Sequence, residues 1–196
     1  PKGTGKTTLI LQHIKGTFGA GSDKAVYFAL DHIFFSDHRP IDVVDYFYTH
    51  GYTHLFIDEV HHVQDWSQLM KTVADFYPGL TVVYSGSSIL KLSAGQADLS
   101  RRQVVYELKG LSFREFLSYE GIADFPVLSV DDILKRHRSL ALEICSKTKI
   151  LPLFNRYLVH GYYPFYKPDV GHFADKLVQV VNNVLNVDLP AVEGVT

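Results

Sequence analysis

Residues 1–10 read PKGTGKTTLI and carry most of a phosphate-binding loop. The general pattern of such a loop is G-x-x-x-x-G-K-[ST], and Gly5, Lys6 and Thr7 supply its second half. The first glycine of the pattern would fall one position before Pro1. We therefore expect the natural polypeptide to begin upstream of Pro1.

The residue types in this loop suit an anion. Gly3 and Gly5 can adopt positive φ without a Cβ penalty, so successive N–H groups can turn toward one ligand. The residues after Gly5 are helical in pattern, and a helix N-terminus carries partial positive charge. In this interpretation Lys6 reaches the β- and γ-phosphates of a nucleotide and the Thr7 hydroxyl holds Mg²⁺. The alternative is a turn that caps an ordinary helix beside a solvated lysine.

The composition is that of a globular chain. Its 196 residues are 46% hydrophobic and 20% charged, which is enough for one domain, or for one domain and a small helical appendage. The formal net charge of −2 argues against a protein that coats nucleic acid by bulk charge. The single cysteine, Cys145, excludes an internal disulfide and is expected to be a buried thiol. No apolar run approaches the roughly 18 residues of a membrane span, so a cytoplasmic location is the default expectation.

Strand and helix patterns alternate in the first part of the chain. Apolar β-rich runs predict strands at residues 24–30 (KAVYFAL), 53–59 (THLFIDE), 80–84 (LTVVY) and 104–108 (VVYEL). Helices are predicted directly after Gly5, at 40–50 and at 66–76. This alternation is typical of βαβ crossovers and a parallel sheet.

The pattern is helical from residue 111 onward. We therefore predict an α/β fold, a P-loop NTPase parallel sheet flanked by helices, followed by a small helical lid or appendage. The expected division is residues 1–110 for the P-loop core and 111–196 for the lid and appended region.

Two acids follow the apolar part of the strand at 53–59. Asp58 and Glu59 reach the carboxyl end of the predicted sheet, where open α/β folds bind their ligands. A carboxylate there can support Mg²⁺, and the next acid is a candidate general base. Acids also begin helices as caps, so the acid pair alone is a weak signal of a magnesium site. Together with the P-loop upstream, it becomes a strong one.

Other polar and aromatic groups leave alternatives open. Residues 85–88 (SGSS) follow the next strand and predict hydroxyls near the γ-phosphate or the attacking water, or a polar turn with a helix cap. The histidines, His61 and His62 among them, suggest a metal site, but structural or solvated histidines are the favoured interpretation. The run YYPFY at 162–166 either stacks bases or, more simply, packs the appendage onto the core.

Four blocks, in this order, resemble a prokaryotic branch of the AAA+ ATPases. They are DEVHHVQDWSQLMK at 58–71, SGSSIL at 85–90, ADLSRRQVVYEL at 97–108 and GLSFREFLSYEGI at 110–122. Members of this branch are predicted ATPases with an appended C-terminal domain. The resemblance covers essentially the whole chain, and FNRYLVHGYYPFY at 154–166 corresponds to the start of the appended region. It implies a central strand before the P-loop and a longer appended domain, so we expect further chain beyond both ends.

The resemblance also implies roles for individual residues. Asp58 and Glu59 would form the Walker B pair, and a serine among residues 85–88, with Ser85 and Ser87 as the candidates, would be sensor 1. The nucleotide-binding residues would be Gly3, Thr4, Gly5, Lys6, Thr7 and Thr8, with Mg²⁺ held by Thr7 and Asp58.

An arginine finger is implied within the DLSRR block. Arg102 or Arg101 would place a guanidinium on the transferring phosphate, where charge grows in the transition state. Supplied in trans, the finger requires a homo-oligomer. The alternative is a solvated pair or a nucleic-acid contact. The lid arginine called sensor 2 stays open among Arg136, Arg138 and Arg156.

The leading functional prediction is an AAA+ ATPase that hydrolyses ATP to ADP and phosphate with Mg²⁺ and couples this to a conformational or regulatory output. The D-x-x-G and N-K-x-D signatures of GTPases are absent from the sequence, which favours the adenine nucleotide. The alternatives are a nucleotide-dependent switch with little turnover and a P-loop kinase of a small acceptor. A DNA or protein partner rests on fold analogy alone, which does not establish function.

Overall fold

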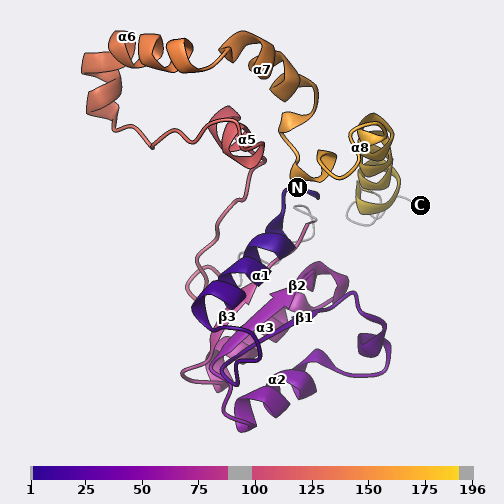
Figure 1. Cartoon of the computed structure of the whole chain (residues 1–196). Helices are drawn as coiled ribbons and strands as arrows, with labels where there is room; N and C mark the ends of the chain where they lie inside the picture. Colours follow the sequence, from indigo (N-terminus) through magenta and orange to yellow (C-terminus); the bar gives the residue numbers. More distant parts are fainter. Residues whose placement is uncertain (1, 88–98, 190–196) are drawn as a thin grey trace. The chain divides into compact units, whose positions relative to one another are not determined.

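The computed structural model describes residues 2–87 and 99–189, which divide into two compact units. The first unit contains the residues up to Leu108 together with those from Val178 onward. The second unit is Lys109–Leu177. Figure 1 shows strands in the first unit, whereas the second is drawn with helices and connecting segments.

The first unit is built around a parallel sheet. Its elements are α1 (Lys6–Thr17), β1 (Ala25–Ala29), η1 (Ile33–Ser36), α2 (Pro40–Thr49), β2 (His54–Asp58), η2 (Val60–His62), α3 (Trp66–Phe76), β3 (Thr81–Tyr84) and η5 (Val184–Asp188). The described strands lie in the order β1-β2-β3, and both pairings are parallel. The α/β class and the parallel sheet predicted from the sequence are therefore confirmed.

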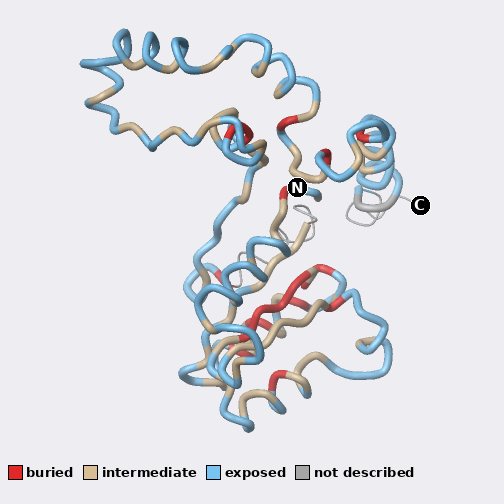
Figure 2. Tube along the Cα trace, in the orientation of Figure 1, coloured by how far each residue is buried: buried red, intermediate tan, exposed pale blue. Residues whose placement is uncertain are grey.

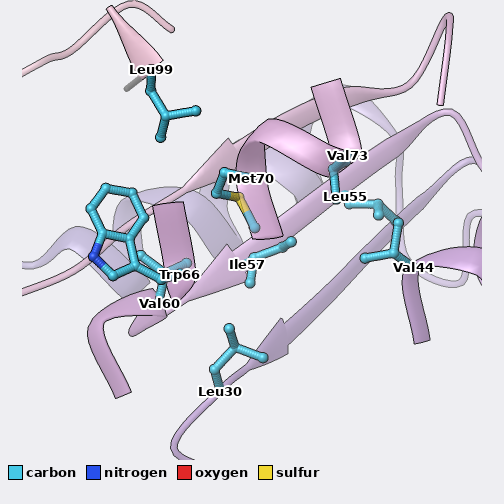
Figure 3. Packing of buried hydrophobic residues seen from close by; sticks show 9 residues of the cluster. All are labelled: Leu30, Val44, Leu55, Ile57, Val60, Trp66, Met70, Val73 and Leu99. Carbon is cyan, nitrogen blue, oxygen red and sulfur yellow. The ribbon is translucent and has the colours of Figure 1, made fainter. Parts of the chain in front are cut away.

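The central strand β2 is buried on both faces. Leu55 and Ile57 point into a core with Val44 of α2 and with Met70 and Val73 of α3 (Figure 3). These five side chains are at most 4% exposed. Along the tube in Figure 2, the buried colour is concentrated on β2 within this unit. A continuous apolar run is what a strand covered by helices on both faces requires.

The opposite face of β2 is covered by α1 and the residue that ends it. The Phe56 ring lies 5.9 Å from the ring of His13 and 6.1 Å from that of Phe18. Phe56 is 2% exposed. Because side chains alternate along a strand, Asp58 lies on the same face of the sheet as Phe56, toward α1. On α1 itself, Ile10 is half-buried but Leu9 is exposed.

Residues 104–108 do not form the predicted strand. Val104, Val105 and Tyr106 are 77%, 60% and 88% exposed, and the structure assigns no strand to this segment. An apolar β-branched run becomes a strand only where a neighbouring strand pairs with it and a core covers one face. Among the described residues, the sheet has no such partner for this segment.

The second unit is helical, as predicted. Its elements are α5 (Phe113–Tyr119), α6 (Val130–Lys147), α7 (Ile150–Arg156), η3 (Tyr157–Gly161), η4 (Pro164–Tyr166) and the start of α8 (Phe173–Asn183). A capping box formed by Ser112 and Glu115 begins α5, because each side chain accepts a hydrogen bond from the other residue's backbone N–H.

An aromatic core holds the second unit together. Phe116, Leu117, Tyr166 and Phe173 are buried in one cluster. The sequence predicted that the run at 162–166 packs onto the P-loop core, but the cluster contacts described for it lie within Lys109–Leu177.

Cys145 corrects another expectation, because it is exposed rather than buried. It lies on α6, and none of the residues of that helix, all of which are described, is buried.

Candidate functional site

The loop before α1 has the backbone geometry of an anion cradle. Gly3 and Gly5 are left-handed, with φ of 81° and 91°, and Thr4 between them is 5% exposed. The helix begins at Lys6, and no side chain in the described parts of the protein caps it by a hydrogen bond. Its first turn also contains no acid. The first turn of α1 thus has neither an acid of its own nor a capping side chain, an arrangement that suits an anionic ligand at the helix N-terminus.

The Asp58 carboxylate connects the loop to the edge of the sheet. Its Oδ2 accepts hydrogen bonds from the Thr7 hydroxyl at 2.5 Å and from the Tyr27 phenol at 3.0 Å. Its Oδ1 accepts from the Ser85 hydroxyl and from the Glu59 backbone N–H. Four donors, from α1, from the middle of β1 and from the residues that directly follow β2 and β3, thus converge on one side chain that is 1% exposed.

These donors set the charge state of Asp58. Burial acts to raise its pKa, but the hydrogen bonds from Ser85, Thr7 and Tyr27 outweigh burial and lower the pKa below its ordinary value. The partner responds in the opposite direction: burial and the adjacent carboxylate raise the pKa of Tyr27 to about 12. At neutral pH the site therefore holds a carboxylate beside a neutral phenol.

Sheet register explains why Tyr27 takes part, a role that the sequence interpretation missed. Tyr27 of β1 is paired with Phe56 of β2. Paired positions of neighbouring strands share a face, and Asp58 follows Phe56 on that face at a spacing of two. The only sequence signal was the position of Tyr27 within the apolar run 24–30, which points to a strand but not to a hydrogen bond.

Glu59 leaves the strand in an unusual backbone conformation. Its φ of 53° and ψ of 40° are left-handed, and among the described residues it is the one non-glycine residue with positive φ. Such a conformation costs about 1–3 kcal/mol and is concentrated at functional sites. The Glu59 Oε2 accepts a hydrogen bond from the Ser87 hydroxyl at 3.1 Å and lies 3.1 Å from the Nδ1 of His61. The turn therefore separates the two acids, so that each has its own set of partners.

Lys6 is electrostatically coupled to both acids. Burial lowers the pKa of its ammonium group, and the charges of Glu59 and Asp58 act in the opposite direction. The loop lysine and the acid pair thus belong to one site.

The remaining candidate residues are placed as follows. Thr8 lies in the exposed first turn of α1, and Arg101 is exposed. The Arg102 guanidinium makes a two-pronged contact with Asp75 of α3, at 2.7 and 3.1 Å. Ser88, the last residue of the polar segment 85–88, lies outside the described residues.

Residues 1–117, more than half of the chain, match the family described as AAA domain. The chain belongs to this AAA domain family. No curated protein and no solved structure matches the sequence. The matched residues of the AAA domain include the loop at 2–8 and the acid pair at 58–59, and membership indicates a nucleotide-binding P-loop domain of the ATPase type. Within the described parts of the chain, no helix is both long enough and apolar enough to cross a membrane.

Proposed function

We propose that this AAA domain binds ATP with Mg²⁺ and hydrolyses it to ADP and phosphate. The observation that carries the proposal is the hydrogen bond of Thr7 to Asp58, which joins the end of the glycine loop to the acidic end of β2. Lys6 of the same loop is coupled to Asp58 and Glu59. A phosphate-binding loop and a carboxylate pair in one site are the parts that nucleotide hydrolysis requires.

The oxygen groups present fit Mg²⁺. Hard divalent cations take hydroxyl, carboxylate, phosphate and water oxygens. Thr7 and Asp58 offer a hydroxyl and a carboxylate in direct contact, and the lowered pKa of Asp58 keeps this carboxylate charged at neutral pH. These two residues would hold the ion. When bound, Mg²⁺ would supply neutralisation of the negative charge on the phosphates.

The side chains around this point have distinct roles in the proposal. The Lys6 ammonium donates hydrogen bonds to phosphate oxygens, and the loop amides at Gly3 to Gly5 do the same. Glu59 accepts a proton from the attacking water through its carboxylate. Ser87 and His61, both 3.1 Å from Glu59 Oε2, orient that carboxylate. ADP and phosphate then leave the loop.

The test is phosphate release from ATP by the intact protein and by three variants. Lys6→Ala should lose nucleotide binding and turnover together. Glu59→Gln should retain ATP but lose turnover by about 10² to 10⁴, the usual contribution of a general base. Lys15→Ala, in the exposed last turn of the same helix, is the matched control and should behave as the wild type.

Each other outcome has a definite meaning. Normal turnover by Glu59→Gln would contradict the role given to this carboxylate. ATP binding by the wild type without phosphate release would support a nucleotide-dependent switch instead. Phosphate that appears on an added small acceptor rather than in water would support a kinase.

A further inference from the structure

We propose that Glu59, His61 and His62 form a binding site for a borderline transition-metal ion such as Zn²⁺. One carboxylate oxygen of Glu59 and one ring nitrogen of each histidine lie within 4.8 Å of one another. The three residues come from one turn of the chain, because Glu59 directly precedes η2, which contains both histidines. The Mg²⁺ site proposed above uses other residues, Thr7 and Asp58.

The distances are close to those of a metal centre. The Oε2 of Glu59 lies 3.1 Å from the Nδ1 of His61. In a tetrahedral zinc site with bonds of about 2.0–2.2 Å, neighbouring ligand atoms are roughly 3.3–3.5 Å apart. The rings of His61 and His62 lie with their centroids 4.6 Å apart and their planes at 52°. A ring nitrogen of the exposed His62, within 4.8 Å of the other two donor atoms, supplies the third ligand.

The three proposed ligands differ in their exposure to solvent. The side chain of His61 is 3% exposed and that of Glu59 is 24% exposed, whereas His62 is on the surface. Two ligands are therefore held by their surroundings, and the third faces the solvent from which an ion arrives. A set of two histidines and one carboxylate with an open fourth position is a known zinc arrangement.

The donor atoms select the ion. Imidazole nitrogen suits Zn²⁺, Co²⁺, Ni²⁺ and Cu²⁺, whereas Mg²⁺ and Ca²⁺ prefer oxygen ligands. Two of the three donors in this site are nitrogens. Zn²⁺ should therefore bind in the presence of a large excess of Mg²⁺.

A functional consequence follows, and it rests on the proposed function. Glu59 is the proposed base, and a carboxylate bound to a metal ion is no longer available to accept a proton from water. Zn²⁺ bound at this site should therefore inhibit ATP hydrolysis without displacing ATP from the loop. Removing Zn²⁺ with a zinc-selective chelator should restore turnover.

The direct test measures metal binding alone, without nucleotide. The intact protein is titrated with Zn²⁺ against a chromophoric chelator in excess Mg²⁺, and Co²⁺ is added separately to record its visible absorption bands. His62→Ala is the main variant because this side chain is exposed, and its thermal unfolding shows whether the fold is retained. His50→Ala, another exposed histidine, is the matched control.

The wild type and His50→Ala should bind one Zn²⁺ with equal affinity. His62→Ala should bind at least about tenfold more weakly, since even outer-shell changes cost 10- to 100-fold. Equal affinity in His62→Ala with a normal melting temperature, or no binding by the wild type, would overturn the proposal.

The second test separates this proposal from the ATPase proposal. Turnover of each protein with Zn²⁺ is divided by its own turnover without Zn²⁺. The wild type should be inhibited at Zn²⁺ concentrations that fill the site, and His62→Ala should need at least about tenfold more. If the wild type binds Zn²⁺ but does not hydrolyse ATP, the hydrolysis proposal is wrong and the Zn²⁺ site proposal stands. Inhibition that is identical in the wild type and His62→Ala would contradict the link between this site and Glu59.

Discussion

The Thr7 hydroxyl donates a hydrogen bond to Asp58 Oδ2 over 2.5 Å, across 51 positions of sequence. This contact ties the first turn of α1 to the end of β2. The two motifs that stand apart in the sequence therefore form one polar site. Because the Asp58 carboxylate is buried, the stability of the first unit should depend on the number of hydrogen bonds that this carboxylate accepts.

Removal of one donor should weaken the first unit. Tyr27→Phe deletes the phenolic hydrogen bond to Asp58 and changes little else at this half-buried position. We expect the free energy of unfolding to fall by about 1–2 kcal/mol, the scale of a hydrogen bond to a charged group. Urea unfolding measures this change. Tyr46→Phe, at an exposed position on α2, is the control and should cost nothing measurable; an equal effect of both substitutions would contradict the account.

Asp58 should also make stability sensitive to acid. Burial raises its pKa, but the hydrogen bonds outweigh burial, so the folded pKa lies below the ordinary value. Stability from a depressed pKa is complete above about pH 4 and is lost as the pH falls through the folded pKa. Asp58→Asn should therefore lose less stability than the wild type as the pH falls below about 4, the ordinary pKa of an aspartate. Urea unfolding at each pH measures the difference.

The control for that experiment is Asp23→Asn, which removes the same charge at an exposed position. Its stability should fall with acid as steeply as that of the wild type. Parallel curves for Asp58→Asn and the wild type would show that the carboxylate gains nothing from its four donors.

Local patterns in the sequence were sufficient for part of this site. The glycine spacing around Lys6 and the apolar run before Asp58 depend on neighbours in the chain, and both led to the correct elements. Tyr27 could not be found in this way, because its contact depends on the register between β1 and β2. The error at 104–108 has the same origin, since a strand needs a partner that propensity does not reveal.

The contact between Glu59 and His61 could not be predicted from the sequence either. In an extended chain, residues two positions apart share a face but lie about 6.6 Å apart. The left-handed residue Glu59 and the turn η2 after it place the Glu59 carboxylate 3.1 Å from the His61 Nδ1. The sequence identified Glu59 as a candidate base from its position directly after Asp58. Its partners, Ser87 and His61, are known only from the structure.

Arg102 allows a test of the arginine-finger prediction. Its guanidinium contacts Asp75, and both side chains are about one-third exposed, so solvent screens the pair and it should contribute little to stability. If Arg102 stabilises the transition state, Arg102→Ala should reduce kcat by about 10³ or more, whereas Asp75→Asn should leave it nearly unchanged. Equal, small effects of both substitutions would make Arg102 a surface ion-pair residue only.

If the arginine finger is supplied in trans, two inactive variants should complement each other. Mixing Arg102→Ala with Lys6→Ala should restore part of the turnover, because one copy keeps the nucleotide site and the other keeps the arginine. Additive, near-zero rates in the mixture would count against a shared site.

In the second unit, Glu120 should matter more than other surface acids. Its side chain is 14% exposed and accepts hydrogen bonds from Tyr166 and Arg156, both at 2.7 Å. Glu120→Gln weakens both contacts, and we expect a loss of about 1–2 kcal/mol in the free energy of unfolding. Glu143→Gln on α6 removes only an exposed pair with Lys147 and should cost clearly less than Glu120→Gln. Urea unfolding that ranks the two variants in the reverse order would refute this assignment.

Calorimetric titration of the intact protein with MgATP tests the central claim most directly. The wild type and Lys15→Ala should release heat with one nucleotide bound per chain, and Lys6→Ala should release none. An absence of heat with the wild type, or equal binding by Lys6→Ala, would contradict a nucleotide site formed by the glycine loop and Asp58.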